Sequence, residues 1–132
     1  MHQRREARFP ANSMYERDLD RTPANFRPLT PLTFLDRAAA TYPDRIAVRY
    51  GELRRTYRDL RTRCHRLAAG LAAIGVVPGD TVAVMAPNVP ELLEAHYGVP
   101  LAGAVLNALN TRLDARTIAY ILGHGEAKVL IT

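Results

Sequence analysis

The sequence predicts an α/β fold in which helices cover both faces of a mostly parallel sheet. Two mostly apolar runs, at 81–86 and 127–132, are typical of strands that are buried on both faces. Segments with a helical repeat of apolar residues lie between the predicted strands. Strand and helix alternate three times after residue 80, which indicates right-handed crossovers between parallel strands.

The start of the chain divides into a leader and a first helix. Residues 1–28 combine mixed charge with three prolines and show no sustained periodicity, so we predict a flexible leader there. A helix is predicted to begin at Thr33, because Asp36 follows at the spacing between a cap and its acidic partner. The predicted apolar stripe of this helix consists of Phe34, Leu35, Ala38, Ala39 and Tyr42.

A hairpin and the most strongly periodic helix of the chain are predicted next. Residues 45–50 alternate in polarity, and residues 53–56 return after a turn at 51–52. Thr56 is the expected N-cap of a helix that ends at Gly75. The apolar face of that helix is predicted to consist of Tyr57, Leu60, Cys64, Leu67, Ala68, Leu71 and Ile74.

The helix predicted after the first apolar run has a start signal and an internal proline. Asn88 is its expected N-cap, because Glu91 follows three positions later. Pro100 is expected to kink or shorten this helix, because proline lacks the N–H that a helix interior requires. Small residues at 102–106 then predict another strand.

The last part of the chain has the pattern of one more helix and one more strand. Thr111 or Asp114 is the expected cap of a helix that carries Ile118, and the glycines within 123–125 are expected to end it. The second apolar run follows directly. Strands of this kind are normally buried on both faces by other elements. We therefore predict that the chain alone aggregates, pairs through a strand edge or binds a hydrophobic dye.

Composition limits the class of protein. A chain of 132 residues with 48% apolar residues can bury a core of its own. No apolar run reaches the roughly 18–20 residues that span a bilayer, and no apolar segment follows the basic start as a signal peptide requires. The single cysteine, Cys64, excludes an internal disulfide and fits a reducing compartment. We therefore expect a cytoplasmic protein.

The basic character of the chain has two interpretations. The net charge is +5, and six arginines lie between Arg54 and Arg66. Such a cluster can attract phosphate or nucleic acid, or it can form the solvated face of a helix. We favour the solvated face, because the arginines fall largely outside the apolar stripe and no zinc-finger spacing occurs. No nucleic-acid partner is expected.

Four sequence segments, in a fixed order along the chain, together form a composite motif. They are 31–48 (PLTFLDRAAATYPDRIAV), 56–60 (TYRDL), 79–91 (GDTVAVMAPNVPE) and 103–113 (GAVLNALNTRL). Together they resemble the opening part of the acyl-adenylate-forming (AMP-binding) enzymes, and within them the acyl-CoA synthetases. The resemblance implies that residues 29–132 are the N-terminal part of an AMP-binding domain, an incomplete subdomain that stops before the phosphate-binding loop.

For a complete enzyme of this family, the resemblance implies a two-step reaction that uses ATP, Mg²⁺ and coenzyme A. A carboxylate attacks the α-phosphate of ATP and gives an acyl-adenylate and pyrophosphate. The thiol of coenzyme A then displaces AMP and leaves a thioester. The sequences of these segments most resemble those of ligases for medium-chain, aromatic or other small carboxylic acids.

This chain departs from the family because it lacks the family's triphosphate-binding motifs. Its only serine is Ser13 and its only lysine is Lys128, and no phosphate-binding glycine loop ends in a lysine. We therefore assign no catalytic, cofactor-binding or metal-binding residue, and we expect the chain alone to be inactive. The alternative is a non-catalytic α/β module that pairs with itself or with a complementary chain.

Two pairs of residues suggest catalytic chemistry, and each has a structural interpretation that we prefer. Glu91 and Glu94 are three positions apart, but acids in a first helical turn are favoured by the helix dipole. Cys64 and His65 are adjacent, but neighbouring helical residues point in different directions. His96 is expected to be a packed or surface histidine.

Three further residues have the strongest claim to contact a ligand in a complete protein. Asn107, Asn110 and Thr111 follow a predicted strand, at the end where parallel sheets place ligand-binding loops. The alternative is that these side chains only cap the next helix and satisfy the loop backbone.

Overall fold

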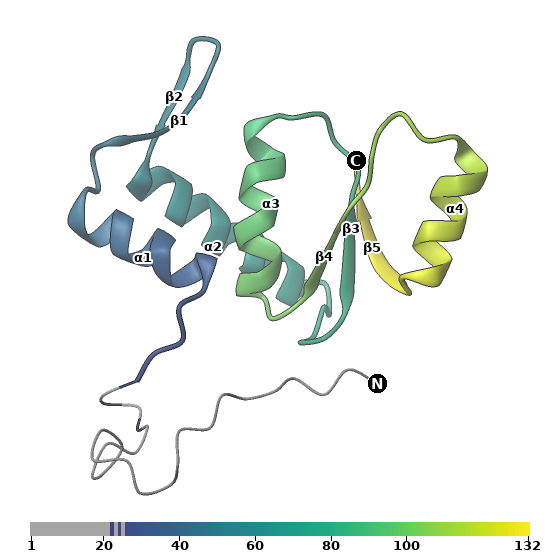
Figure 1. Cartoon of the computed structure of the whole chain (residues 1–132), viewed down its shortest axis with the longest axis horizontal. Coiled ribbons are helices and arrows are strands. Elements are labelled where there is room, and N and C mark those ends of the chain that lie inside the picture. Colours follow the sequence, from purple (N-terminus) through teal and green to yellow (C-terminus); the bar gives the residue numbers. More distant parts are fainter. Residues whose placement is uncertain (1–21, 23, 25) are drawn as a thin grey trace, which may run out of the picture.

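The computed structural model describes residues 22, 24 and 26–132, and it confirms an α/β architecture with a parallel sheet (Figure 1). Most of the predicted leader lies outside the described residues. The elements in chain order are α1 (Pro31–Thr41), β1 (Ile46–Tyr50), β2 (Leu53–Thr56), α2 (Tyr57–Ala73), β3 (Thr81–Val84), α3 (Pro90–Leu101), β4 (Val105–Ala108), α4 (Ala115–His124) and β5 (Ala127–Ile131). Among the described residues, no helix has the length and apolar character needed to cross a membrane.

Helix α1 begins earlier than the sequence predicts. Thr30 is the N-cap, and its side-chain oxygen accepts the N–H of Thr33 at 3.3 Å. The hydroxyl oxygen of Thr33 accepts the N–H of Thr30 at 3.1 Å, so Thr33 is the partner in a capping box and not the cap. The predicted apolar stripe is also too wide: Leu35 is buried, but Phe34 and Tyr42 are more than half exposed.

The hairpin β1–β2 and helix α2 form as predicted. The two strands pair antiparallel, and Thr56 caps α2 by accepting the N–H of Asp59 at 3.1 Å. Asp59 completes the capping box by accepting the N–H of Thr56 at 3.0 Å. Gly75 has a φ of +88° just after the helix, a conformation that glycine adopts readily. Ile74 is 66% exposed, so the predicted apolar face does not extend to the end of α2.

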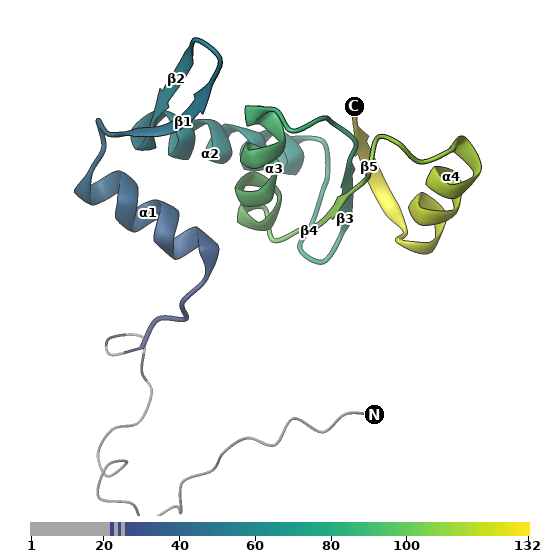
Figure 2. The same cartoon turned by 45° about the horizontal axis from the view of Figure 1, so that its top comes forward.

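A first core joins α1, the hairpin and α2. Its buried residues are Leu35, Val48, Leu60 and Cys64. Helices α1 and α2 pack over this small cluster. The hairpin projects from one side of the molecule (Figure 1; Figure 2). This part of the fold is local in sequence, and it positions α2 for its contact with α3.

The second core lies between the parallel sheet and helices α2 and α3. The strand order is β4-β3-β5, with β3 paired in parallel to both neighbours. Helices α3 and α4 lie on opposite sides of the sheet (Figure 1; Figure 2). The buried residues of this core are Leu71, Val76, Val82, Val84, Ala95, Val99 and Ala104. The sheet therefore has a well-covered face under α3 and a less covered face under α4. Helix α4 itself contains no buried residue.

Asn88 is not the cap of α3, contrary to prediction. Val89 takes that position without a side-chain hydrogen bond, and Pro90 follows at the first helical position. Proline suits this position because its fixed φ is helical and its missing N–H would have no partner there. Glu91 is engaged with Arg55 instead of with a cap. Helix α3 ends one residue after Pro100, in agreement with the expected shortening.

Strand boundaries also differ from prediction. β3 ends at Val84 instead of residue 86, and β4 occupies Val105–Ala108 instead of 102–106. The shift of β4 has a local cause: Gly103 has a φ of +76° and turns the chain between α3 and the strand. Asp114, one of the two expected caps of α4, accepts the N–H groups of Arg116 and Thr117 at 3.0 Å each.

Candidate functional site: a groove at the ends of the strands

A groove with a volume of about 650 Å³ lies between α2 and α3, at the carboxyl ends of β3 and β5. We call it the α2–α3 groove. Its lining residues are Arg63, Arg66 and Leu67 of α2, Val84, Ala86 and Pro87 at and after the end of β3, Val89, Glu91, Leu92, Glu94 and Ala95 of α3 and its N-terminal flank, and Ile131 and Thr132 at the end of β5. Ligands of α/β proteins commonly bind beyond the carboxyl ends of parallel strands, so this is the first place to look for a site.

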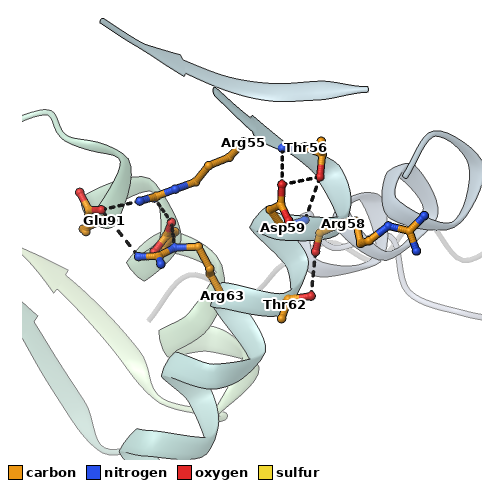
Figure 3. A network of polar contacts seen from close by, with 8 residues as sticks. Arg55, Thr56, Arg58, Asp59, Thr62, Arg63 and Glu91 are labelled. Carbon is orange, nitrogen blue, oxygen red and sulfur yellow. Dashed lines mark hydrogen bonds and ion pairs between the residues drawn. The ribbon is translucent and has the colours of Figure 1, made fainter. Parts of the chain in front are cut away.

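Two glutamates and two arginines form an ion-pair network beside the groove (Figure 3). Glu94 is the centre, and its side chain is only 7% exposed. Its carboxylate accepts a hydrogen bond from Arg63 Nε at 2.6 Å and another from Arg55 Nη1. Arg55 Nη2 also donates to Glu91 at 2.9 Å. The network therefore ties β2 and α2 to α3.

The network favours the charged forms of Glu91 and Arg63. The hydrogen bond from Arg55 holds the pKa of Glu91 below its ordinary value, and the hydrogen bond to Glu94 raises the pKa of Arg63. A lowered carboxylate pKa is the opposite of what a general acid at neutral pH requires. Each carboxylate is also matched by a guanidinium. The two glutamates act as structural anchors for the arginines.

Glu91 and Glu94 both form ion pairs with arginines, an interaction that the helix dipole alone does not describe. Arg55 and Arg63 belong to the arginine cluster that we interpreted as a solvated face, and Arg55 is only 14% exposed. The partners are 31 to 39 residues apart in sequence. No local spacing could therefore reveal this network. The one available signal was the number of arginines, six of them within residues 54–66.

The loop after β4 forms a second, smaller crevice, of about 350 Å³. Asn110 and Thr111 line it together with Asn88. Asn110 accepts the N–H of Arg112 at 2.9 Å, which satisfies the loop backbone as the alternative interpretation requires. Asn107 is half-buried within β4 and is not among the residues that line this crevice. The structure therefore brings two of the three predicted ligand-contacting residues together.

Cys64 and His65 lie in different surroundings, one buried and one exposed. Burial raises the pKa of the Cys64 thiol to about 11, because the thiolate would have to leave water. His65 is exposed and lies 3.9 Å from Asp36 on the outer side of α2. His96 Nδ1 is 2.8 Å from the carbonyl oxygen of Leu92, one turn earlier in α3. Among the described residues, no three metal-ligating side chains gather in one place.

Lys128 lies at the opposite end of the sheet from the groove. It projects from β5 and forms an ion pair with Asp80 at 2.7 Å, just before β3 begins. The hydrogen bond from Lys128 holds the pKa of Asp80 below its usual range. The only lysine of the chain is therefore engaged at the amino ends of the strands.

The sequence matches one protein family and many of its members. The model of the family described as "AMP-binding enzyme" matches residues 35–132. The chain is 50% identical over 114 residues to the peroxisomal acetate/butyrate–CoA ligase of Arabidopsis thaliana and 52% identical over 113 residues to its peroxisomal benzoate–CoA ligase. Each alignment covers 86% of this chain and 20% of the relative. The chain thus spans about a fifth of the length of these curated relatives.

Solved structures show the same architecture. A putative long-chain fatty-acid CoA ligase from Rhodopseudomonas palustris superposes with a TM-score of 0.73 at 41% identity, over 77% of this chain and 26% of that chain. The N-terminal subdomain of NpsA from Klebsiella oxytoca superposes with a TM-score of 0.72 at 30% identity, over 77% and 27% of the two chains. The fold expected from the resemblance, part of an N-terminal subdomain of adenylate-forming enzymes, is therefore confirmed.

Proposed function

Because this chain belongs to the AMP-binding enzyme family, we propose that it is the N-terminal part of an acyl-CoA synthetase that joins a small carboxylic acid to coenzyme A with ATP. The observation that carries the proposal is the identity of about half of all aligned residues to CoA ligases. Those relatives are named for acetate, butyrate and benzoate. A short aliphatic or aromatic acid is accordingly the proposed substrate class.

The described residues do not fit a triphosphate. In the α2–α3 groove, Arg63 is already matched by Glu94, and Arg66 is a single exposed cation. The only lysine is engaged at the other end of the sheet. A triphosphate site needs convergent N–H groups and uncompensated cations. We therefore propose that ATP, Mg²⁺ and coenzyme A are bound by other parts of a complete enzyme. The role proposed for this chain is to build and brace one wall of the catalytic domain.

Exchange of pyrophosphate into ATP, which reports formation of the acyl-adenylate, tests this proposal. We expect no exchange by this chain alone with acetate, butyrate or benzoate. We expect exchange with acetate and butyrate when residues 26–132 replace the matched segment of the Arabidopsis acetate/butyrate–CoA ligase. The unmodified ligase is the positive control.

Two outcomes of this experiment would contradict the proposal. Exchange by this chain alone would show that the residues that bind ATP lie within it. A folded hybrid without exchange, beside an active unmodified ligase, would show that the chain does not provide the same wall. Folding of the hybrid is checked by its cooperative thermal transition.

We also propose a cytoplasmic location, which the single buried cysteine supports because such a thiol suits a reducing compartment. Several relatives are named as peroxisomal proteins. Fluorescence microscopy of the tagged protein in its own cells distinguishes the two locations: a diffuse signal is expected, and a punctate signal would contradict the proposal.

A further inference from the structure

Positive charge is concentrated in the part of the chain that forms α1, the hairpin and most of α2. Residues 26–66 contain ten arginines and four acidic residues, which gives a net charge of +6. Residues 67–132 contain three basic and five acidic residues, which gives a net charge of −2. We call residues 26–66 the basic lobe. Charge of one sign gathered in one region raises the local concentration of ligands of the opposite sign.

A polar crevice of about 450 Å³ lies in the basic lobe, between α1 and α2, and we call it the α1–α2 crevice. Three of its lining residues are arginines: Arg27 precedes α1, and Arg58 and Arg61 belong to α2. Asp36 of α1 is the one acidic residue of the lining. The lining residues therefore carry more positive than negative charge.

The carboxylate of Asp36 is shared by several cations. Arg61 Nε donates a hydrogen bond to it at 2.7 Å, and Arg27 Nη2 and His65 Nε2 each lie 3.9 Å from it. The hydrogen bond from Arg61 holds the pKa of Asp36 below its ordinary value, so this carboxylate is ionised at neutral pH. Two guanidinium groups, and the imidazolium of His65 when it is protonated, thus face a single negative charge.

The third arginine of the crevice is held only at the surface. Figure 3 shows Arg58 pointing away from Glu91 and the ion-pair network beside the α2–α3 groove. Arg58 Nη2 lies 3.1 Å from Asp44, but the two side chains are 63% and 83% exposed. Exposed ion pairs contribute little to stability because water and salt screen them. A ligand with a higher charge density can therefore replace Asp44 at small cost.

The donors of the crevice indicate the chemical class of the ligand. A guanidinium group presents a planar fork of N–H donors that matches two oxygens of a phosphate group. The lining residues on α1 and α2 have their backbone N–H groups in backbone hydrogen bonds, so they do not form the cradle that a nucleotide triphosphate requires. The crevice suits an anion that side chains alone can hold.

We propose that the α1–α2 crevice binds a phosphate-bearing anion through the guanidinium groups of Arg27, Arg58 and Arg61. Such a group can come from a soluble diphosphate or from the headgroup of a phosphorylated lipid. The arginine cluster of the sequence accordingly has two roles, because Arg55 and Arg63 brace α3 and the arginines of the crevice hold a ligand.

Calorimetric titration of the full chain with pyrophosphate, at low salt and without divalent cations, tests the inference. We expect saturable binding of one anion per chain. Arg58→Gln and Arg27→Gln should each weaken this binding by about tenfold, because each removes a charge-assisted hydrogen bond to the anion. Both side chains are exposed, so the thermal transition should not change.

Arg116→Gln is the matched control, because it removes the same charge from an exposed residue of α4, outside the basic lobe. It should change the affinity less than twofold. An equal loss of affinity in Arg116→Gln and Arg58→Gln would overturn the inference, because net charge and not the crevice would then attract the anion.

Co-sedimentation with vesicles distinguishes the two sources of the phosphate group. Vesicles of phosphatidylcholine with phosphatidylinositol bisphosphate are compared with vesicles of phosphatidylcholine alone. Binding of pyrophosphate without retention on either vesicle would identify a soluble ligand. Retention on the phosphorylated vesicles that Arg58→Gln abolishes would identify a lipid headgroup. If neither probe binds, or if both variants of the crevice leave the binding unchanged, the inference is overturned.

Discussion

The carboxylate of Glu94 in α3 holds two consecutive elements, β2 and α2, through arginines that lie 39 and 31 residues earlier in the sequence. It is nearly inaccessible to water, yet it stays compatible with burial because two guanidinium groups donate to it. The desolvation of such a group is costly unless its hydrogen-bonding capacity is satisfied. The contribution of this ion pair is therefore best measured by what happens when one charge is removed.

We predict that Glu94→Gln lowers the free energy of unfolding by about 2–4 kcal/mol, because it leaves the mostly buried guanidinium of Arg55 with only the exposed Glu91 as a charged partner. Glu91→Gln is the matched control. Its side chain is 56% exposed, so we expect a loss below about 1 kcal/mol. Urea unfolding followed by circular dichroism measures both. Equal losses in the two variants would contradict the central role of Glu94.

The thiol of Cys64 should be unreactive in the folded chain. It is fully buried, and burial raises its pKa to about 11, so neither access nor ionisation favours reaction at pH 8. We expect no colour from a disulfide reagent such as Ellman's until denaturant is added, and one equivalent afterwards. Fast labelling of the native protein would show that α1 or the hairpin opens readily over this core.

The contacts of individual residues were only partly predictable from the sequence. Thr56 forms the N-cap of α2 as predicted, and its partner Asp59 lies within one turn. The pairs of Arg55 and Arg63 with Glu94 depend on how α2 and α3 pack, and no periodicity in the sequence encodes that contact. Long-range ion pairs are a property of the assembled helices.

At the scale of elements, the contact between α2 and α3 depends on a residue without a side chain. A Cβ at Gly98 would lie 2.7 Å from Leu67 Cδ2 and 3.0 Å from its Cβ, so rotation of the leucine side chain cannot relieve the clash completely. We predict that Gly98→Ala destabilises the fold by about 1–3 kcal/mol. Thermal and urea unfolding measure the change.

Gly70→Ala provides the control for that prediction. Gly70 is also helical, but nothing lies within 4 Å of an added Cβ. The alanine should stabilise α2 by up to about 1 kcal/mol, because it reduces the backbone freedom of the unfolded chain. A stabilising Gly98→Ala would show that the two helices have room to separate.

The order and type of the elements were predictable, but several ends were not. Strong periodicity gave α2 and the alternation of strands and helices. The predicted start of α1 at Thr33 was wrong because threonine can serve either as a cap or as the partner of a cap. The predicted cap at Asn88 was wrong because Pro90 fixes the first helical position. Local side-chain chemistry offers alternatives at element ends, and packing selects among them.

At the scale of the whole molecule, several carboxylates link stability to pH. Hydrogen bonds from Arg61 to Asp36, from Arg55 to Glu91 and from Lys128 to Asp80 hold each of these pKa values below the ordinary ones of 3.8 and 4.5. A lowered pKa in the folded state means that the stabilisation is complete above the ordinary pKa. It is lost as the pH falls through the folded value.

We therefore predict a constant urea midpoint between about pH 7 and pH 5, and a decline that begins near pH 4.5 and continues below pH 3.8. Added salt should reduce the size of the decline, because these carboxylates are partly exposed. A midpoint that rises on acidification would contradict the assignment of these ion pairs as stabilising.

The exposed apolar surface gives a further prediction for the isolated molecule. Ile131 and Val129 have no strand beside them on the outer edge of β5 within residues 26–132, and Leu130 faces away from α3 with 43% of its surface exposed. We expect the chain alone to bind a hydrophobic dye such as anilinonaphthalene sulfonate, or to dimerise. A monomer that does not bind the dye would argue against an uncovered edge.

The central position of β3 has a consequence for how the sheet comes apart. Either outer strand can detach by breaking one ladder, but β3 leaves only when the ladders to β4 and β5 break together. Openings of the sheet are therefore graded: transient fraying removes an edge, and release of the middle strand coincides with loss of the whole fold.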